Sequence, residues 1–200
     1  MTEPTGDKHA VALAAMGDPN LLSELVSNLG SSSRRLRQNS ASAITEVANA
    51  DANLLADHIS SIAAALSRHE AQTRWECLDA LTLLVDVDSR ACEKAIVGAD
   101  AALFDEGPGT LHLSAMRFLC KLGATTQKRS EKTWDYIDEA IQCYHGDPEF
   151  YEMLNAVIGF SKGALAPSVK RGLKERMVFD AENAKGLLQR RAQEIIDNLA

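Results

Sequence analysis

Residues Leu36 to Ala48 read L-R-Q-N-S-A-S-A-I-T-E-V-A, and residues Thr73 to Val85, 37 positions later, read T-R-W-E-C-L-D-A-L-T-L-L-V. The two stretches follow one helical pattern, in which Arg37 matches Arg74 and the apolar positions coincide. Upstream, three apolar residues recur with the same period: Leu22, Leu25 and Leu29 become Ile59, Ile62 and Leu66. A period of this length, made of two helices, is typical of a solenoid, whose units bury their apolar faces only against neighbouring units.

Turn signals divide the chain into five helical pairs. Gly17, Asp18 and Pro19 provide a helix stop, a cap and a first-turn proline. The expected pairs cover residues 19–29 with the segment up to 50, 53–67 with 71–87, 90–104 with 110–122, 130–144 with 148–162, and 167–178 with 181–199. Residues 9–16 form a short apolar turn before them. We therefore predict an all-α superhelix over residues 9–200, as a single domain after a flexible tail, residues 1–8.

Composition agrees with this fold class. Of 200 residues, 46% are hydrophobic but only 5% are aromatic, which favours helices over strands. No apolar stretch reaches the roughly 18 residues that a membrane span needs, and the N-terminal residues lack the apolar region of a signal peptide. The cysteines are far apart, at positions 77, 92, 120 and 143, on apolar helical positions. We expect a cytoplasmic protein with reduced core thiols and no membrane segment.

The two quoted stretches resemble the second helix of a HEAT repeat, which often reads V-R-x-x-A-A-x-A-L-x-x-I-A. The chain is thus similar to small HEAT-repeat, or more broadly armadillo-like, proteins over about residues 18–162. The resemblance implies a scaffold, adaptor or regulatory subunit that holds another macromolecule along a concave face lined by second helices. Only two of the five units keep the signature arginine, Arg37 and Arg74, so a regular ladder of arginine–aspartate contacts between repeats is not expected.

Outward positions of the second helices are the candidate partner-binding site. At about 100° per residue, Leu36, Ser40, Ala41, Ile44 and Val47 form the buried side of their helix. Two outward rows follow from the repeat shifts: Gln38, Trp75, His112 and Tyr151, and then Ser42, Asp79, Met116 and Asn155. Exposed aromatic and methionine side chains often anchor interfaces. The predicted contact residues are therefore Trp75, Asp79, His112, Met116, Tyr151 and Asn155. The alternatives are partial burial by solenoid curvature or a register that differs by one residue.

Charge bears on the class of partner. The net charge of −7 disfavours general nucleic-acid binding, because phosphate contacts need a basic surface. Residues 1–161 carry 13 basic and 23 acidic side chains, whereas residues 162–200 carry 8 and 5. Two basic patches could contact an acidic partner or simply be solvated: Arg34, Arg35 and Arg37, and Lys162, Lys170, Arg171, Lys174 and Arg176.

Catalytic patterns are weak. The five histidines are scattered, and no phosphate-binding glycine loop, nucleophile elbow or H-E-x-x-H motif is present. We predict a non-enzymatic interaction scaffold with a protein partner of unknown identity, without metal or cofactor. One alternative is an enzyme that resembles the HEAT-like DNA glycosylases for alkylated bases, with Trp75 and Asp79 on a concave face that would have to be basic. The other is a regulatory subunit of a cofactor-attaching enzyme.

Overall fold

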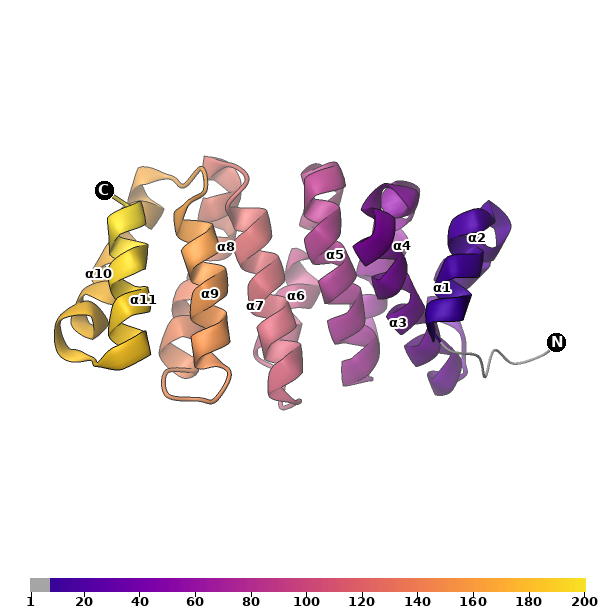
Figure 1. Cartoon of the computed structure of the whole chain (residues 1–200), viewed down its shortest axis with the longest axis horizontal. Coiled ribbons are helices and arrows are strands. Elements are labelled where there is room, and N and C mark those ends of the chain that lie inside the picture. Colours follow the sequence, from indigo (N-terminus) through magenta and orange to yellow (C-terminus); the bar gives the residue numbers. More distant parts are fainter. Residues whose placement is uncertain (1–7) are drawn as a thin grey trace. The chain divides into compact units, whose positions relative to one another are not determined.

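The computed structural model describes residues 8–200, and within that range it is built of helices with short connections and no strand (Figure 1). The predicted all-α class is confirmed. The chain divides into two compact units, residues 1–102 and 103–200. The predicted tail lies outside the described residues except for Lys8, which begins the first helix. The prediction of a single domain stays a prediction.

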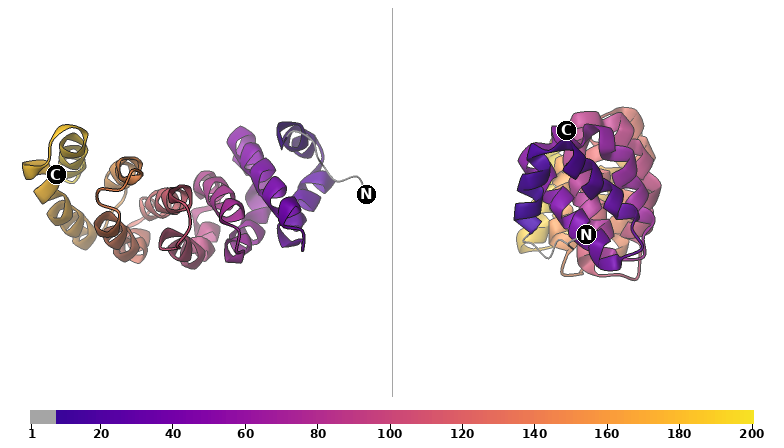
Figure 2. Two further views of the ribbon diagram at one scale, coloured as in Figure 1. Left: turned by 90° about the horizontal axis from the view of Figure 1, so that it is seen from below. Right: turned by 90° about the vertical axis from the view of Figure 1, so that its right-hand side faces the viewer.

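Unit 1 holds the first helices of the chain. They are α1 (Lys8–Gly17), α2 (Pro19–Ser27), α3 (Arg34–Asp51), α4 (Ile59–Ala64), α5 (Ala71–Cys92) and most of α6 (Ile96–Leu103), with 3₁₀ turns at Asn28–Gly30, Ala52–His58, Ala65–Ser67 and Glu93–Ala95. Helix α1 packs on α3 and α3 packs on α5, while α2 contacts α4 in a second layer (Figures 1 and 2). Residues 9–16 were predicted only as a short apolar turn. In the structure, α1 packs on α3 as α3 packs on α5, so it takes the position that the second helix of a pair has in the repeat.

Capping side chains set the helix boundaries in unit 1. The Asp18 carboxylate accepts a hydrogen bond from the Asn20 amide (2.8 Å), and the Ser33 hydroxyl accepts one from Leu36 (3.3 Å). Helix α5 is broken at Asp88, whose backbone is extended (φ −147°, ψ 86°) and whose side chain accepts from the Ala91 amide. This break lies next to the predicted boundary after residue 87.

The core of unit 1 follows the repeated pattern. Ile44 and Val47 of α3 and their counterparts Leu81 and Leu84 of α5 are fully buried. Each such side chain contributes about 1.5–3 kcal/mol by leaving water. The apolar periodicity therefore predicted the contact between α3 and α5 correctly.

Unit 2 contains α7 (Gly109–Gly123), α8 (Gln127–Cys143), α9 (Phe150–Ser161), α10 (Pro167–Asn183) and α11 (Gly186–Asn198). Helix α7 packs on α9, α9 packs on α11, and α8 contacts α10, so this unit also has two layers (Figure 1). We call α1, α3 and α5 the second-helix layer of unit 1, and α7, α9 and α11 that of unit 2.

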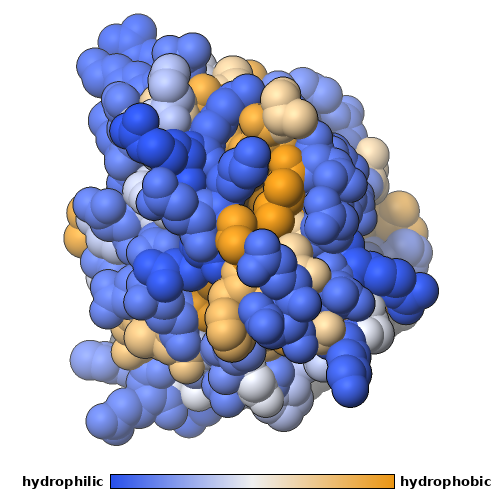
Figure 3. All heavy atoms as spheres, turned by 90° about the vertical axis from the view of Figure 1, so that its left-hand side faces the viewer, coloured by the Kyte–Doolittle hydropathy of each residue, from blue (hydrophilic) through white to orange (hydrophobic). Residues whose placement is uncertain are grey.

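Two predictions in unit 2 are wrong in detail. Helix α10 was expected to end near Val178 but continues to Asn183, because Asp180 lies on its buried side and the turn occurs at Gly186, whose φ is +67°. Cys143 is exposed rather than part of the core, since it is the last residue of α8. At the α10–α11 end, a stripe of hydrophobic side chains runs between hydrophilic margins (Figure 3).

Candidate functional site

Unit 1 has a hollow of about 300 Å³ on the side of its second-helix layer. It lies where α1 and the end of α2 meet the middle of α3 and the start of α5. Its lining is mostly polar: Lys8, Val11, Leu25, Asn28, Asn39, Ser40, Ser42, Gln72 and Glu76. We call this space the Glu76 hollow.

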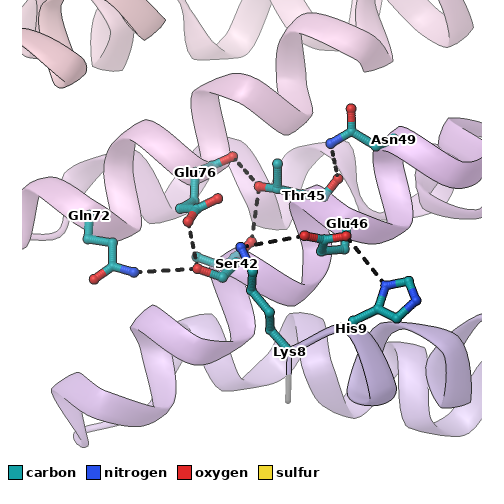
Figure 4. A network of polar contacts seen from close by, with 9 residues as sticks. Lys8, His9, Ser42, Thr45, Glu46, Asn49, Gln72 and Glu76 are labelled. Atoms are coloured by element: carbon teal, nitrogen blue, oxygen red, sulfur yellow. Dashed lines mark hydrogen bonds and ion pairs between the residues drawn. The ribbon is translucent and has the colours of Figure 1, made fainter.

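A chain of hydrogen bonds fixes the Glu76 carboxylate in this hollow (Figure 4). The Ser42 hydroxyl donates to Glu76 Oε1 at 2.6 Å and accepts from Gln72 Nε2 at 3.4 Å. Nearly one turn further along the same face of α3, the Thr45 hydroxyl lies 2.8 Å from the Glu76 carbonyl oxygen and 3.2 Å from that of Ala41. The carboxylate is therefore held by a neutral donor, and α3 and α5 are linked by side chains from both helices.

The rim of the hollow carries a second carboxylate. Glu46 of α3 lies 3.5 Å from the Lys8 ammonium and 3.7 Å from a ring nitrogen of His9 (Figure 4). Lys8 and His9 are both more than half exposed, so these contacts are solvent-screened. Helix α1 thus reaches the second-helix layer mainly through charged groups at its first turn.

The predicted residues of unit 1 lie beside the hollow. Trp75 and Asp79 are half-buried on α5, on the turn that also carries Glu76. About two turns beyond Asp79, Asp86 is exposed. Ser42 was predicted to point outward, but it is only 6% exposed, because α1 and the start of α5 cover that part of α3.

Tyr151 and Asn155 lie on the second-helix layer of unit 2, and both are exposed as predicted. The carboxylate between them belongs to Glu152, which lies 3.8 Å from Arg117 of α7 and 3.9 Å from Arg191 of α11. Asn155 donates to Glu152 at 3.1 Å. The face of unit 2 is therefore a network of exposed charges rather than a hollow.

Arg191 joins α11 to α9 in a specific way. Its guanidinium donates to the Tyr151 carbonyl oxygen and lies over the Tyr151 ring, 5.9 Å from the ring centre. A planar cation above an aromatic face is an attractive arrangement. Tyr151 is thereby held at the surface with 43% of its area exposed.

The predicted outward positions of α7 are wrong by one residue. Met116 is completely buried, and half-buried His112 stacks on Tyr144 at 5.0 Å with a ring nitrogen 2.8 Å from the Asp105 carbonyl oxygen. The residues that follow them, half-buried Leu113 and exposed Arg117, occupy the outward positions instead. The constant shift of 37 fails here because the loop before α7 changes the register.

The contacts around Tyr144 indicate that His112 has a structural role. The Tyr144 hydroxyl donates to the Leu103 carbonyl oxygen, and Phe104 stacks near the same ring. Burial, and to a lesser degree nearby acidic groups, raises the pKa of Tyr144, so its hydroxyl stays protonated and remains a donor. These contacts fix the loop at Asp105 to the end of α8.

The signature arginines are interior groups. Arg37 pairs with Glu70, the residue just before α5, and donates to the Ser31 carbonyl oxygen at 2.6 Å. Glu70 is only 8% exposed and Arg74 is buried as well. One contact between repeats therefore uses glutamate, whereas Arg176 of α10 pairs with Asp138 of α8 at 2.7 Å.

Titratable groups of the described residues 8–200 include no set of three or more His, Cys, Asp or Glu side chains placed to hold a metal ion. His145 lies 3.1 Å from the buried Asp180, as a pair without a third such ligand. Burial raises the pKa of the Cys77 and Cys120 thiols far above their usual range. Thiols in that state are poor nucleophiles. Within the same range, no helix has the length and apolar character to cross a bilayer.

Comparison with known proteins supports the fold. Neither protein-family models nor curated protein sequences match the chain. Among solved structures, it is similar to a designed armadillo repeat protein in complex with the peptide (KR)4, with a TM-score of 0.79, 15% identity, and coverage of 96% of this chain and 90% of that one. A computationally designed armadillo repeat protein for modular peptide recognition is similar as well, with a TM-score of 0.72 and 15% identity. The match covers 96% of this chain and 91% of that one.

A natural protein is similar too. The archaeal HEAT-like repeats protein of Thermococcus onnurineus NA1 matches with a TM-score of 0.62 and 17% identity, over 96% of this chain and 92% of that one. The chain therefore has the armadillo/HEAT-like repeat fold, as the resemblance of its second helices implied. At these identities the similarity extends to the fold alone.

Proposed function

We propose that this protein is a non-enzymatic scaffold that binds protein partners on the second-helix layer of unit 1 and, separately, on that of unit 2. The observation that carries the proposal is the polar hollow of unit 1, which is lined by residues of α1, α3 and α5 and by Leu25 and Asn28 at the end of α2. Repeat folds of this type commonly bind proteins, and one similar structure contains a bound peptide. A surface without a catalytic constellation is suited to binding.

The proposed contact residues differ in part from those predicted from sequence. Trp75, Asp79, Tyr151 and Asn155 remain in the set, and Glu76 and Arg117 join it. His112 and Met116 are left out because their side chains are engaged or buried inside unit 2. Aromatic anchors with neighbouring charges are the usual composition of a binding hot spot.

The nucleic-acid alternative gains no support from the charges of unit 1. Glu46, Glu76, Asp79 and Asp86 make its second-helix layer acidic around the Trp75 side chain. A phosphate backbone would be repelled there. In unit 2 the cations Arg117 and Arg191 lie on the same surface as the carboxylate of Glu152, so that face carries charges of both signs. Regulation of another enzyme remains compatible with the scaffold proposal, and the mostly buried cysteines fit a cytoplasmic location.

The test compares three tagged variants in partner capture from the native host. Trp75→Ala and Tyr151→Ala each remove an aromatic group of a second-helix layer. Phe179→Ala is the matched control, because Phe179 is a 70% exposed aromatic residue on α10, in the other layer of unit 2. We expect a stoichiometric partner to be lost or weakened with the first two variants and retained with the control, while circular dichroism shows that all three are folded. Equal capture by every variant would contradict the proposed surface.

A further inference from the structure

We propose that the free side of helix α1 in unit 1 is a contact surface for the same helix of a second copy of this chain, packed in the antiparallel direction. The inference goes beyond the proposed function, since it involves none of the side chains assigned there to partner binding. It is carried by the composition of α1, by its position in the repeat and by the charges at its two ends.

Helix α1 lacks the polar face that a terminal helix needs. Residues 10–17 read A-V-A-L-A-A-M-G, so beyond its first turn no side of this helix carries a polar side chain. Only Ala12 and Ala15 are buried, whereas 56% of the area of Leu13 is exposed. Helices that are apolar all round are normally buried, and terminal repeats of a solenoid usually present a polar outer face. Unit 1 therefore leaves an apolar side of α1 uncovered.

The uncovered side of α1 faces away from α3. Lys8 and His9, which contact Glu46, mark the side toward α3. At about 100° per residue, four exposed residues lie on the opposite side: Ala10, Leu13, Ala14 and Gly17. Helix α3 packs between α1 and α5, whereas α1 packs on α3 alone among the second helices of residues 8–102 (Figure 1). The uncovered side is thus the side on which a further helix of this layer would pack.

The shape of this side is self-complementary. Leu13 is the one large side chain of the four, and it stands between the small residues Ala10, Ala14 and Gly17. A Cβ added to Gly17 would meet nothing within 4 Å, so the space at that end is open. A two-fold contact uses the same patch on both partners, and a protruding group must therefore fit a recess of that patch. With the axis near the middle of the four residues, Leu13 of each copy lies among the small residues of the other.

The two ends of α1 are complementary in charge. Lys8, in the first turn, has 57% of its side chain exposed. The last turn has no basic side chain, and Asp18 follows it directly. The C-terminal end of a helix is partially negative and attracts cations. An antiparallel contact sets the cationic first turn of each copy beside the negative last turn of the other, whereas a parallel contact would set like charges together. The charges therefore select a second copy in the antiparallel direction.

The first experiment measures self-association of the full chain by sedimentation velocity. The contact is small, so we expect a reversible monomer–dimer equilibrium with a Kd on the order of 10–100 µM. Leu13→Glu should weaken it about tenfold or more, because the carboxylate would lose water in an apolar contact. Val97→Glu is the matched control, since Val97 is a 76% exposed aliphatic residue of α6 and the change in charge is the same. Its effect should stay below about twofold, and circular dichroism checks that both variants are folded.

The second experiment tests the direction of the two helices. Single cysteines are placed in a Cys143→Ser background, because Cys143 is an exposed thiol. Ala14→Cys lies next to the two-fold axis and should form a disulfide-linked dimer on mild oxidation, since a disulfide needs Cα atoms within about 7 Å. Two Ala10→Cys residues would be about 10 Å apart along the antiparallel helices, so this variant should stay monomeric on a non-reducing gel.

Several outcomes would overturn the antiparallel dimer. A monomer at all concentrations would leave the side of α1 to another partner, and equal weakening by Leu13→Glu and Val97→Glu would place the contact elsewhere. Cross-linking of Ala10→Cys as readily as Ala14→Cys would indicate a parallel contact. Species larger than a dimer would contradict a two-fold contact, which closes with two copies. Trp75→Ala should leave self-association unchanged, so loss of partner capture and loss of the dimer are distinguishable.

Discussion

The second-helix layers of the two units are both built of helices that pack side by side, but their surface side chains differ. In unit 1, charged groups of α1 contact α3, and a hollow lined by Lys8 and Glu76 lies beside them. In unit 2, Arg117 and Arg191 lie on either side of Glu152, and the charges are matched within the surface itself. A repeat fold thus fixes the scaffold, while a few side chains decide whether a given stretch is open to a ligand or already satisfied.

The largest expected difference between the units concerns a buried and an exposed glutamate. Glu70→Ala removes the partner of the mostly buried Arg37 and should lower the free energy of unfolding by about 3–5 kcal/mol. Glu152→Ala in unit 2 removes solvent-exposed contacts and should cost less than about 1 kcal/mol. Urea unfolding followed by circular dichroism measures both. Similar losses would mean that the pair in unit 1 is as well solvated as the network in unit 2.

Two glycines test how tightly each unit is packed. A Cβ on Gly163 would lie 2.5 Å from the Ala124 carbonyl oxygen and 2.6 Å from its Cα, so Gly163→Ala must move backbone and should cost about 1–3 kcal/mol. Gly17, at the end of α1, has nothing within 4 Å of such a Cβ, and Gly17→Ala should change stability by no more than about 0.5 kcal/mol. Thermal melts of both variants check the contrast, and a neutral Gly163→Ala would refute the close approach.

Thiol labelling compares the interiors of the units directly. Burial raises the pKa of Cys77 in unit 1 and of Cys120 in unit 2, so both stay protonated and unreactive in the native state. Cys92 is buried too, whereas Cys143 is exposed. Iodoacetamide at mildly alkaline pH should add a single group, which peptide mass spectrometry places on Cys143. Fast labelling of Cys77 in the folded protein would show that α3 and α5 separate readily.

The smallest expected effect on stability concerns the contact between Arg191 and Tyr151 in unit 2. Arg191→Lys keeps the positive charge but loses the planar group over Tyr151, and should cost about 0.5–1 kcal/mol. Arg190→Lys on the same helix is the control, since Arg190 is exposed. The difference between the two variants in chemical denaturation gives the contribution of the stacked arrangement. If the two variants had the same free energy of unfolding, Arg191 would contribute no more to stability than an ordinary surface charge.

Prediction from sequence succeeded where one repeat copies another closely. The pattern of Leu36 to Ala48 recurs in Thr73 to Val85 without insertion, and the buried positions of α3 therefore transferred correctly to α5. The loop before α7 broke that transfer, and Met116 was placed outside although it is fully buried. A one-residue change of register turns a helix by about 100°, which is enough to exchange core and surface.

By itself, the sequence determined the all-α repeat fold, most helix boundaries and the acidic character of residues 1–161, because apolar periodicity and capping residues act over a few neighbouring positions. The tertiary structure alone decided that α1 covers Ser42 and that Ser42 meets Gln72 and Glu76, which lie 30 and 34 residues further along the chain. Such contacts depend on how whole helices pack, and no local pattern encodes the distance between side chains on separate helices. The Glu76 hollow is therefore a property of packing, built from residues whose types alone gave no sign of it.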